Sequence, residues 1–168
     1  MSAASEDVLL ELSRLEAVHL RGLVNQFVDL LTGSPDAATD PAISRLVPSA
    51  YPDDESAAAQ FRSATQPELL RRRTHEAAAV LADLAIAGDV TDPQSLSESA
   101  ARTEFTLTLD RGRAASWMRT LAAVRLVLAS RLGITSEEDH DPDDPRFGVY
   151  EWLGYRLDQL TRAASAAA

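Results

Sequence analysis

Residues 110–133 read DRGRAASWMRTLAAVRLVLASRLG, and this apolar stretch decides the fold. Apolar side chains recur in it at intervals of three and four, the spacing of one stripe along an α-helix. The stripe consists of Trp117, Leu121, Val124, Leu128 and Leu132. Asp110 is a favourable N-cap and Gly133 a favourable C-terminal stop, so both ends of the helix are marked. We expect this helix to be the central and most buried element.

The N-terminal part of the chain predicts two helices. The first is long and amphipathic, running from about residue 6 to residue 31 and ending before Gly33-Ser34-Pro35. Its expected core side chains are Leu12, Leu15, Leu23 and Phe27. The second is short and ends at Val47, because Asp40-Pro41 places a capping carboxylate before a proline at the first helical position.

Two further helices are predicted between residues 53 and 87. One begins at the carboxylates of residues 53–55, which complement the helix dipole, and ends near Thr65. The other begins at Pro67 and ends before Gly88, and a polar loop follows over residues 88–102. We expect Phe61 and Leu81 to lie in the core.

Residues 104–109, EFTLTL, alternate polar and apolar side chains and are the one predicted strand. A single strand needs a partner for its backbone groups. We consider a second copy of the chain, an extended segment near Val90, or an extended lead-in that covers the core without pairing.

The C-terminal part predicts an acidic loop over residues 135–146 and a last helix that contributes Trp152 and Leu153 to the core. The Ala-rich tail from Ala163 is expected to fray. The elements together predict one domain over residues 1–168 with an ordered core of about 6–162. Its fold class is mainly α, a compact multi-helix domain with at most one short strand or hairpin near residues 104–109.

The composition excludes several classes of protein. The chain has 168 residues, a formal net charge of −10 and no cysteine. The charge argues against a general nucleic-acid binder, and the lack of cysteine excludes disulfides and thiolate chemistry. Residues 1–7 have no signal-peptide pattern and no apolar run is long enough to span a membrane, so we expect a cytoplasmic protein without a membrane segment.

The acidic stretch DHDPDD at residues 139–144 begins like a calcium loop, because Asp139, Asp141 and Asp143 alternate. The pattern then fails: the sixth position is Asp144 instead of glycine, and the twelfth is Tyr150 instead of glutamate. We expect a solvated loop without a metal and keep the three carboxylates as alternative ligands. No catalytic spacing or cofactor motif stands elsewhere in the chain.

The arginines are the candidate contact residues. Arg71, Arg72 and Arg73 follow Arg62 in the densest basic stretch, although consecutive helical side chains point about 100° apart and do not form one flat patch. A second set lies within the most apolar helix, where an arginine must pair with a carboxylate, reach solvent or meet a partner. This set includes Arg119, Arg125 and Arg131.

Three blocks of the sequence resemble an uncharacterised actinobacterial family of domains of unknown function, numbered two-zero-one-seven. The blocks are DPAISRLVPSAY (40–51) with Asp53-Asp54 and Phe61-Arg62, WMRTL to RLG (117–133), and YEWLG (150–154). Together they span most of the chain, from about residue 8 to residue 162. The family has no established enzymatic activity, and some of its members carry a label of transcriptional or stress regulator, so the resemblance favours regulation. A mechanism based on cysteine oxidation does not transfer to this chain.

These observations predict a non-enzymatic helical regulatory or adaptor protein that acts by contact with another protein and forms a possible homodimer. The candidate contact residues are Arg62, Arg71, Arg72, Arg73, Arg119 and Arg125. Two alternatives stay open. One is a DNA-binding regulator with a helix-turn-helix in residues 53–87, and the other is a metal-dependent enzyme that uses the acidic loop 137–144.

Overall fold

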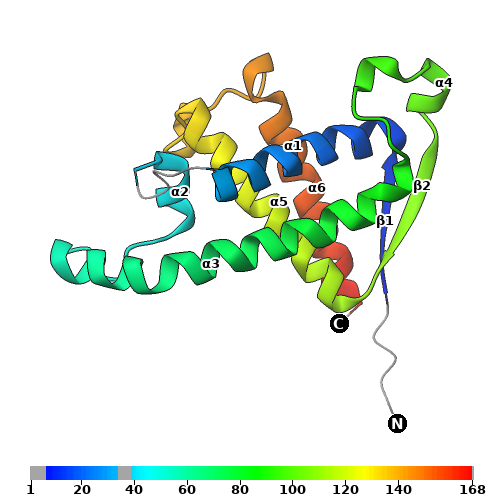
Figure 1. The fold of residues 1–168 in the computed structure, drawn as a ribbon. Coiled ribbons are helices and arrows are strands. Elements are labelled where there is room, and N and C mark those ends of the chain that lie inside the picture. Colours follow the sequence, from blue (N-terminus) through cyan, green and yellow to red (C-terminus); the bar gives the residue numbers. More distant parts are fainter. Residues whose placement is uncertain (1–6, 34–38, 168) are drawn as a thin grey trace, which may run out of the picture.

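The helices pack against one another, and a two-stranded sheet lies along one side of them (Figure 1). The computed structural model describes residues 7–33 and 39–167. Within these ranges the elements are β1 (Val8–Ser13), α1 (Arg14–Gly33), α2 (Pro41–Leu46), α3 (Glu55–Leu84), α4 (Glu98–Ala101), β2 (Glu104–Leu109), α5 (Arg111–Leu132) and α6 (Gly148–Ala166). The predicted fold class, a mainly α multi-helix domain, is confirmed.

The central position of α5 is also confirmed. It packs against α1, α2, α3, α6 and β2. Asp110 caps its first turn by accepting a hydrogen bond from the Arg113 amide at 2.9 Å. Gly133 ends it at φ 74°, a left-handed conformation that favours glycine. Trp117 and Leu121 on the predicted stripe are among the most deeply buried side chains.

The predicted first helix begins too early. Residues Val8–Ser13 form strand β1, which pairs antiparallel with β2 from Val8 opposite Leu109 to Ser13 opposite Glu104. The strand pairs with the N-terminal segment of its own chain, an arrangement that was not among the three considered for residues 104–109. Val8, Leu10 and Leu12 face the core because alternate residues of a strand point to one side.

A capping box at residues 13–16 separates β1 from α1. The Glu16 carboxylate accepts a hydrogen bond from the Ser13 amide at 2.9 Å, and the Glu16 amide donates to the Ser13 hydroxyl at 3.2 Å. This S-x-x-E pattern marks a helix N-terminus. It was the sequence signal for the true start of α1.

Helix α3 is continuous where two helices were predicted. Pro67 lies inside it, and the helix runs on from Glu55 to Leu84. A proline removes one backbone hydrogen bond, whose acceptor here would be the Ser63 carbonyl. Because Pro67 and Ser63 are both exposed, that carbonyl faces water instead of an apolar interior. The turn of a helix-turn-helix is therefore absent from residues 53–87.

The N-terminal half of α3 extends past the other helices (Figure 1). We define residues 51–73, which include this half and the turn before it, as the arm. Phe61 lies on the arm and is 41% exposed, so its predicted place in the core is wrong. Helical periodicity gives the face on which a side chain lies, but it does not say whether the neighbouring helices reach that far.

The remaining core predictions hold to different degrees. Leu12, Phe27, Trp117, Leu121, Val124 and Leu153 are buried, whereas Leu15, Leu23, Leu81, Leu128 and Trp152 are partly buried. The predicted loops contain short helical turns, which are α4 and the 3₁₀ turns Pro93–Ser95, Glu137–Asp139 and Pro145–Phe147. Helix α6 continues to Ala166, past the residue at which fraying was expected.

Two leucines of β1 test the strand assignment. In a helix Leu9 and Leu12 would share a face, but in β1 Leu9 is 62% exposed and Leu12 is fully buried. We expect Leu12→Ala to lower the free energy of unfolding by about 3 kcal/mol and Leu9→Ala by less than about 0.5 kcal/mol. Urea denaturation measures both, and equal losses would contradict the register.

Candidate functional site

Four arginines recur every six residues along α5, and three of them pair with carboxylates. Six residues are roughly one and two-thirds helical turns, so successive arginines leave α5 in different directions. Arg113 pairs with Asp83 of α3, and Arg119 binds Glu76 of α3 at 2.7 Å. Arg131 binds the N-cap carboxylate of α2 at 2.8 Å.

Arg125 is the exception in this series. No ion pair joins it to a carboxylate among residues 7–33 and 39–167. Its Nε instead donates a hydrogen bond to the Tyr150 carbonyl oxygen at 3.2 Å, and its guanidinium lies 3.9 Å from the centre of the Tyr150 ring. Gly154 makes room for this position, because a Cβ there would lie 3.0 Å from the Arg125 Nε.

Arg45, in the last turn of α2, is held in a comparable way. Its Nη1 donates to the Ile134 carbonyl oxygen at 2.9 Å. Ile134 itself is fixed by the end of α5, since its amide donates to the Ala129 carbonyl at 2.8 Å after the left-handed Gly133. This is the Schellman arrangement of a helix C-terminus. The glycine that ends α5 therefore fixes the Ile134 carbonyl, and this carbonyl positions the Arg45 guanidinium of α2.

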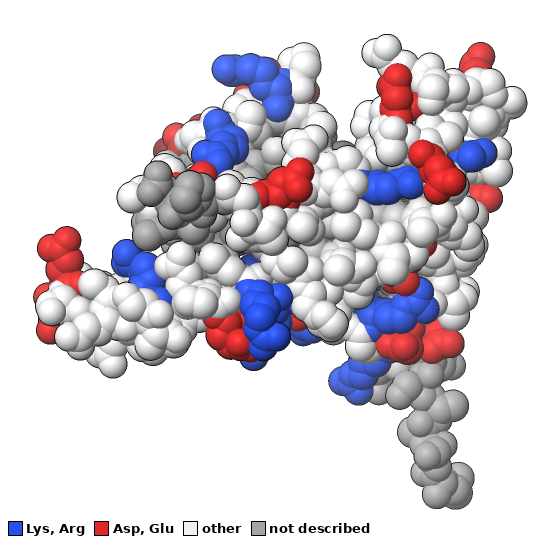
Figure 2. Space-filling view, in the orientation of Figure 1, with Lys and Arg blue, Asp and Glu red and all other residues white. Residues whose placement is uncertain are grey.

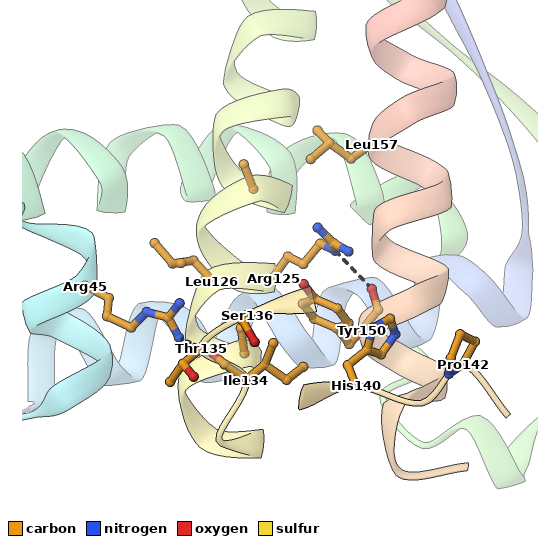
Figure 3. Close-up of a pocket in the computed structure, with 12 residues that line it drawn as sticks. Arg45, Arg125, Leu126, Ile134, Thr135, Ser136, His140, Pro142, Tyr150 and Leu157 are labelled. Atoms are coloured by element: carbon orange, nitrogen blue, oxygen red, sulfur yellow. Dashed lines mark hydrogen bonds between the residues drawn. The ribbon is translucent and has the colours of Figure 1, made fainter. Parts of the chain in front are cut away.

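Arg45 and Arg125 line one cleft of about 640 Å³, which we call the α2–α5–α6 cleft. In Figure 3 Arg45 lies at the α2 end of the cleft and Arg125 lies nearer to α6, beside Tyr150, with Leu126 and Ile134 between the two arginines. The lining consists of Arg45, Ala122, Arg125, Leu126, Ala129, Ile134, Thr135, Ser136, His140, Pro142, Tyr150 and Leu157. None of these described residues is Asp or Glu, although the whole chain carries 26 of them.

An aromatic stack supports the Tyr150 side of the cleft. The His140 ring lies edge-on to Tyr150, with centroids 5.5 Å apart, and edge-on to the buried Phe147 at 5.4 Å. His140 also lies against the Glu151 carboxylate. These contacts restrict the Tyr150 ring and therefore the guanidinium above it.

The sequence named Arg125 as a contact residue but did not find the cleft. Arg45, Ile134, His140 and Tyr150 come from α2, the α5 end, a loop and α6, and no short motif joins them. The glycine stop of α5 was the one local signal for part of the site.

The other candidate arginines lie elsewhere. Arg71 pairs with Glu68 at 2.8 Å on the exposed face of α3, and Arg72 is exposed. Arg73 is half-buried, and its burial lowers its pKa from the ordinary value. Its Nη2 lies 3.4 Å from the Leu46 carbonyl oxygen, so it joins α3 to α2. Arg62 is partly buried on the arm.

The carboxylates of Asp139 and Asp141 accept hydrogen bonds from the acidic loop itself. Asp139 accepts hydrogen bonds from the Thr135 hydroxyl and from the amides of Thr135 and Ser136, both at 2.9 Å, which lowers its pKa to about 2. Asp141 accepts from the Asp143 amide at 3.0 Å. Across residues 7–33 and 39–167, no group of three or more His, Cys, Asp and Glu side chains is placed to hold a metal ion.

The chain is a helical domain whose two-stranded sheet joins segments that are distant in the sequence. A family model described as Domain of unknown function (DUF2017) matches residues 1–164, and the chain belongs to this family. No curated protein and no solved structure matches the chain. No described helix has the length and apolar character of a membrane span.

Asp139 provides a test of the capped-loop assignment. The hydrogen bond from Thr135 and those from the two amides hold its pKa at about 2, below the usual 3.8. Its contribution to stability is therefore present above the unfolded pKa and is lost as the pH falls through about 2. Carboxyl ¹³C NMR should give this midpoint with and without added Ca²⁺, and a large shift with Ca²⁺ would revive the metal alternative.

The pair of the exposed Arg119 and the buried Glu76 provides a second test. Arg119→Leu removes the cation that is hydrogen-bonded to Glu76 but leaves Arg73 nearby, and we expect a loss of about 1–2 kcal/mol in the free energy of unfolding. The double variant with Glu76→Leu should recover most of the loss, because it removes the unpaired charge as well. If both changes cost the same as the sum of the single variants, Arg119 does not act through this pair.

Proposed function

We propose that the chain is a non-enzymatic regulatory or adaptor protein that acts by contact with another protein, and that the arm is its contact surface. The observation that carries the proposal is an exposed aromatic pair. Tyr51 and Phe61, 48% and 41% exposed, lie edge-on with centroids 5.9 Å apart. Aromatic residues and arginine are enriched in protein interfaces, where they supply much of the binding energy.

The shape of the arm favours a protein partner. Figure 2 shows it projecting from the body, with a mostly uncharged surface behind an acidic tip. A projecting helix buries little of its surface against its own chain and is free to enter a groove. The arm also carries Arg72, which forms no ion pair with any described residue and can bind a carboxylate at the rim of such a groove.

The charge of the arm distinguishes this proposal from DNA binding. Four acidic residues (Asp53, Asp54, Glu55 and Glu68) balance four arginines (Arg62, Arg71, Arg72 and Arg73). A surface without net charge gives a contact whose affinity depends weakly on salt, whereas phosphate contacts give a steep dependence.

Two wider parts of the proposal have other support. Regulation of transcription or of a stress response rests on the resemblance given above, and a cytoplasmic location stays a prediction. The homodimer stays a prediction, but the unpaired strand no longer supports it, because β2 pairs with β1 of its own chain.

The test combines crosslinking with matched variants. A photoreactive phenylalanine analogue at position 61 should crosslink one partner in cells that express the tagged chain. The double variant Phe61→Ser and Arg72→Glu should weaken that complex, once purified, by about a hundredfold or more. Ile86→Ser is the control, since it removes another large apolar side chain that is 65% exposed but lies outside the arm.

Each outcome decides one part of the proposal. Equal weakening by Ile86→Ser, or no defined crosslink at position 61, would remove the arm as contact surface. A crosslink to a second copy of the chain would assign the arm to a homodimer. A crosslink to nucleic acid, with affinity that falls steeply with salt, would favour the DNA-binding alternative.

A further inference from the structure

We propose that the α2–α5–α6 cleft is a binding site for an amphipathic organic anion, a carboxylate or phosphate group attached to an apolar chain. This inference concerns a surface separate from the arm and does not depend on the proposed function. It follows from the charge, the preorganisation and the apolar lining of the cleft.

The charge of the cleft is opposite to that of the chain. The net charge is −10, but the lining contains Arg45 and Arg125 and no described carboxylate. Each of the other three arginines in the six-residue series on α5 has a carboxylate partner. Arg125 is partly buried without one, and the protein offsets its charge only with the Tyr150 ring and carbonyl, so an anion from outside is favoured there.

Both guanidiniums are held in place while keeping free donors. The Arg125 Nε is bound to the Tyr150 carbonyl, and Arg45 uses its Nη1 on the Ile134 carbonyl. The remaining N–H groups of each fork have no partner among the described residues. A fixed guanidinium loses little conformational entropy when it binds a carboxylate or phosphate, so these positions favour anion binding.

Much of the cleft lining is apolar. Leu126, Ala129, Ile134 and Leu157 contribute to it beside the polar Thr135 and Ser136, and Figure 3 shows Leu126 and Ile134 between Arg45 and Arg125. The volume of about 640 Å³ lies in the range of sites for small molecules, about 300–1,000 Å³. A small inorganic anion would leave this apolar surface in contact with water. A ligand with an apolar chain fills it.

Neighbouring carboxylates define the direction of entry. Glu151 and Asp158 border the groove on the other side of Arg125, next to Gly154. They repel an anion there, and Glu151 already lies against His140. The anionic group therefore approaches Arg125 from the cleft and not from that groove. Asp139 lies beside the lining residues Thr135 and Ser136, and its carboxylate already accepts hydrogen bonds from both.

Isoleucine methyl NMR on the whole chain tests the site without a variant. The chain has three isoleucines: Ile134 lines the cleft, Ile43 is buried in α2 and Ile86 is exposed outside the cleft. Titration with octanoate should shift the Ile134 signal in a saturable way and leave Ile86 unchanged. Octyl phosphate, run in parallel, distinguishes phosphate from carboxylate as the preferred group. Acetate, inorganic phosphate and octanol each lack half of the proposed ligand and should bind at least about tenfold more weakly.

Charge-removing variants locate the binding group. Arg125→Gln should weaken octanoate binding about tenfold or more in calorimetry, and Arg45→Gln should also weaken it. Arg111→Gln is the matched control, since it removes an exposed arginine from the same helix outside the cleft. Arg125→Lys keeps the charge and replaces Arg125→Gln if that variant does not fold.

The proposal is overturned if Ile134 does not shift with either octanoate or octyl phosphate. It is also overturned if octanol binds as tightly as octanoate, or if Arg111→Gln weakens binding as much as Arg125→Gln. The latter result would mean general attraction to a charged helix. Because the arm takes no part in these measurements, their outcome is independent of the crosslinking experiment.

Discussion

The ion pairs that surround α5 are the constraint on which the fold depends. Helix α5 contacts α1, α2, α3, α6 and β2, and each ion pair lies where one of these contacts meets the surface. The guanidiniums of Arg113, Arg119 and Arg131 are about half-exposed, and they pair with mostly buried carboxylates of α3 and of the α2 N-cap. The indole of Trp117 strengthens the same boundary by donating to Asp83 at 2.8 Å. The polar contacts thus fix which helices lie against α5 and in which register.

Arg125 differs from the other three arginines of this series, because it has no carboxylate partner among the described residues. A paired arginine mainly specifies structure, because its charge is already compensated. Arg125 keeps an uncompensated charge beside an apolar surface, and α6 provides only a carbonyl and an aromatic ring. The same helix therefore stabilises the fold with three arginines and presents the fourth to a cleft. The arm differs from the cleft, since its exposed aromatic pair suits a large partner and the cleft a small one.

The sequence predicted those parts of the fold whose signals are local. Helix α5 was found with both ends because Asp110 and Gly133 mark them, and α2 was found from Asp40-Pro41. Residues 8–13 were misassigned because VLLELS fits the helical period as well as the strand period, and its pairing partner lies far along the chain. Pro67 was misleading because a proline opens helices more often than it lies within one.

The candidate sites depend on tertiary packing even more than the fold does, so the sequence predicted less of them. The sequence showed Arg62 and Arg71–Arg73 as one basic stretch. It did not show that Arg71 pairs with Glu68 or that Arg73 contacts α2. Periodicity predicted the helical face of Phe61 correctly, but it did not predict that α3 extends past the neighbouring helices and leaves Phe61 exposed. The cleft joins residues from four segments, so it exists only after tertiary packing. Periodicity and capping describe a single element, and these features depend on several.

The pairing of β1 with β2 also determines the order in which the chain can assemble. The two strands lie roughly ninety residues apart, a separation that delays contact formation because a long loop must close first. On a ribosome that adds about 5–20 residues per second, β1 waits some 5–20 s for its partner to be synthesised. During that interval α1 and α3 can form, but the apolar side of β1 stays without its sheet. The N-terminal strand, first in the sequence, is therefore among the last elements to reach its native contacts.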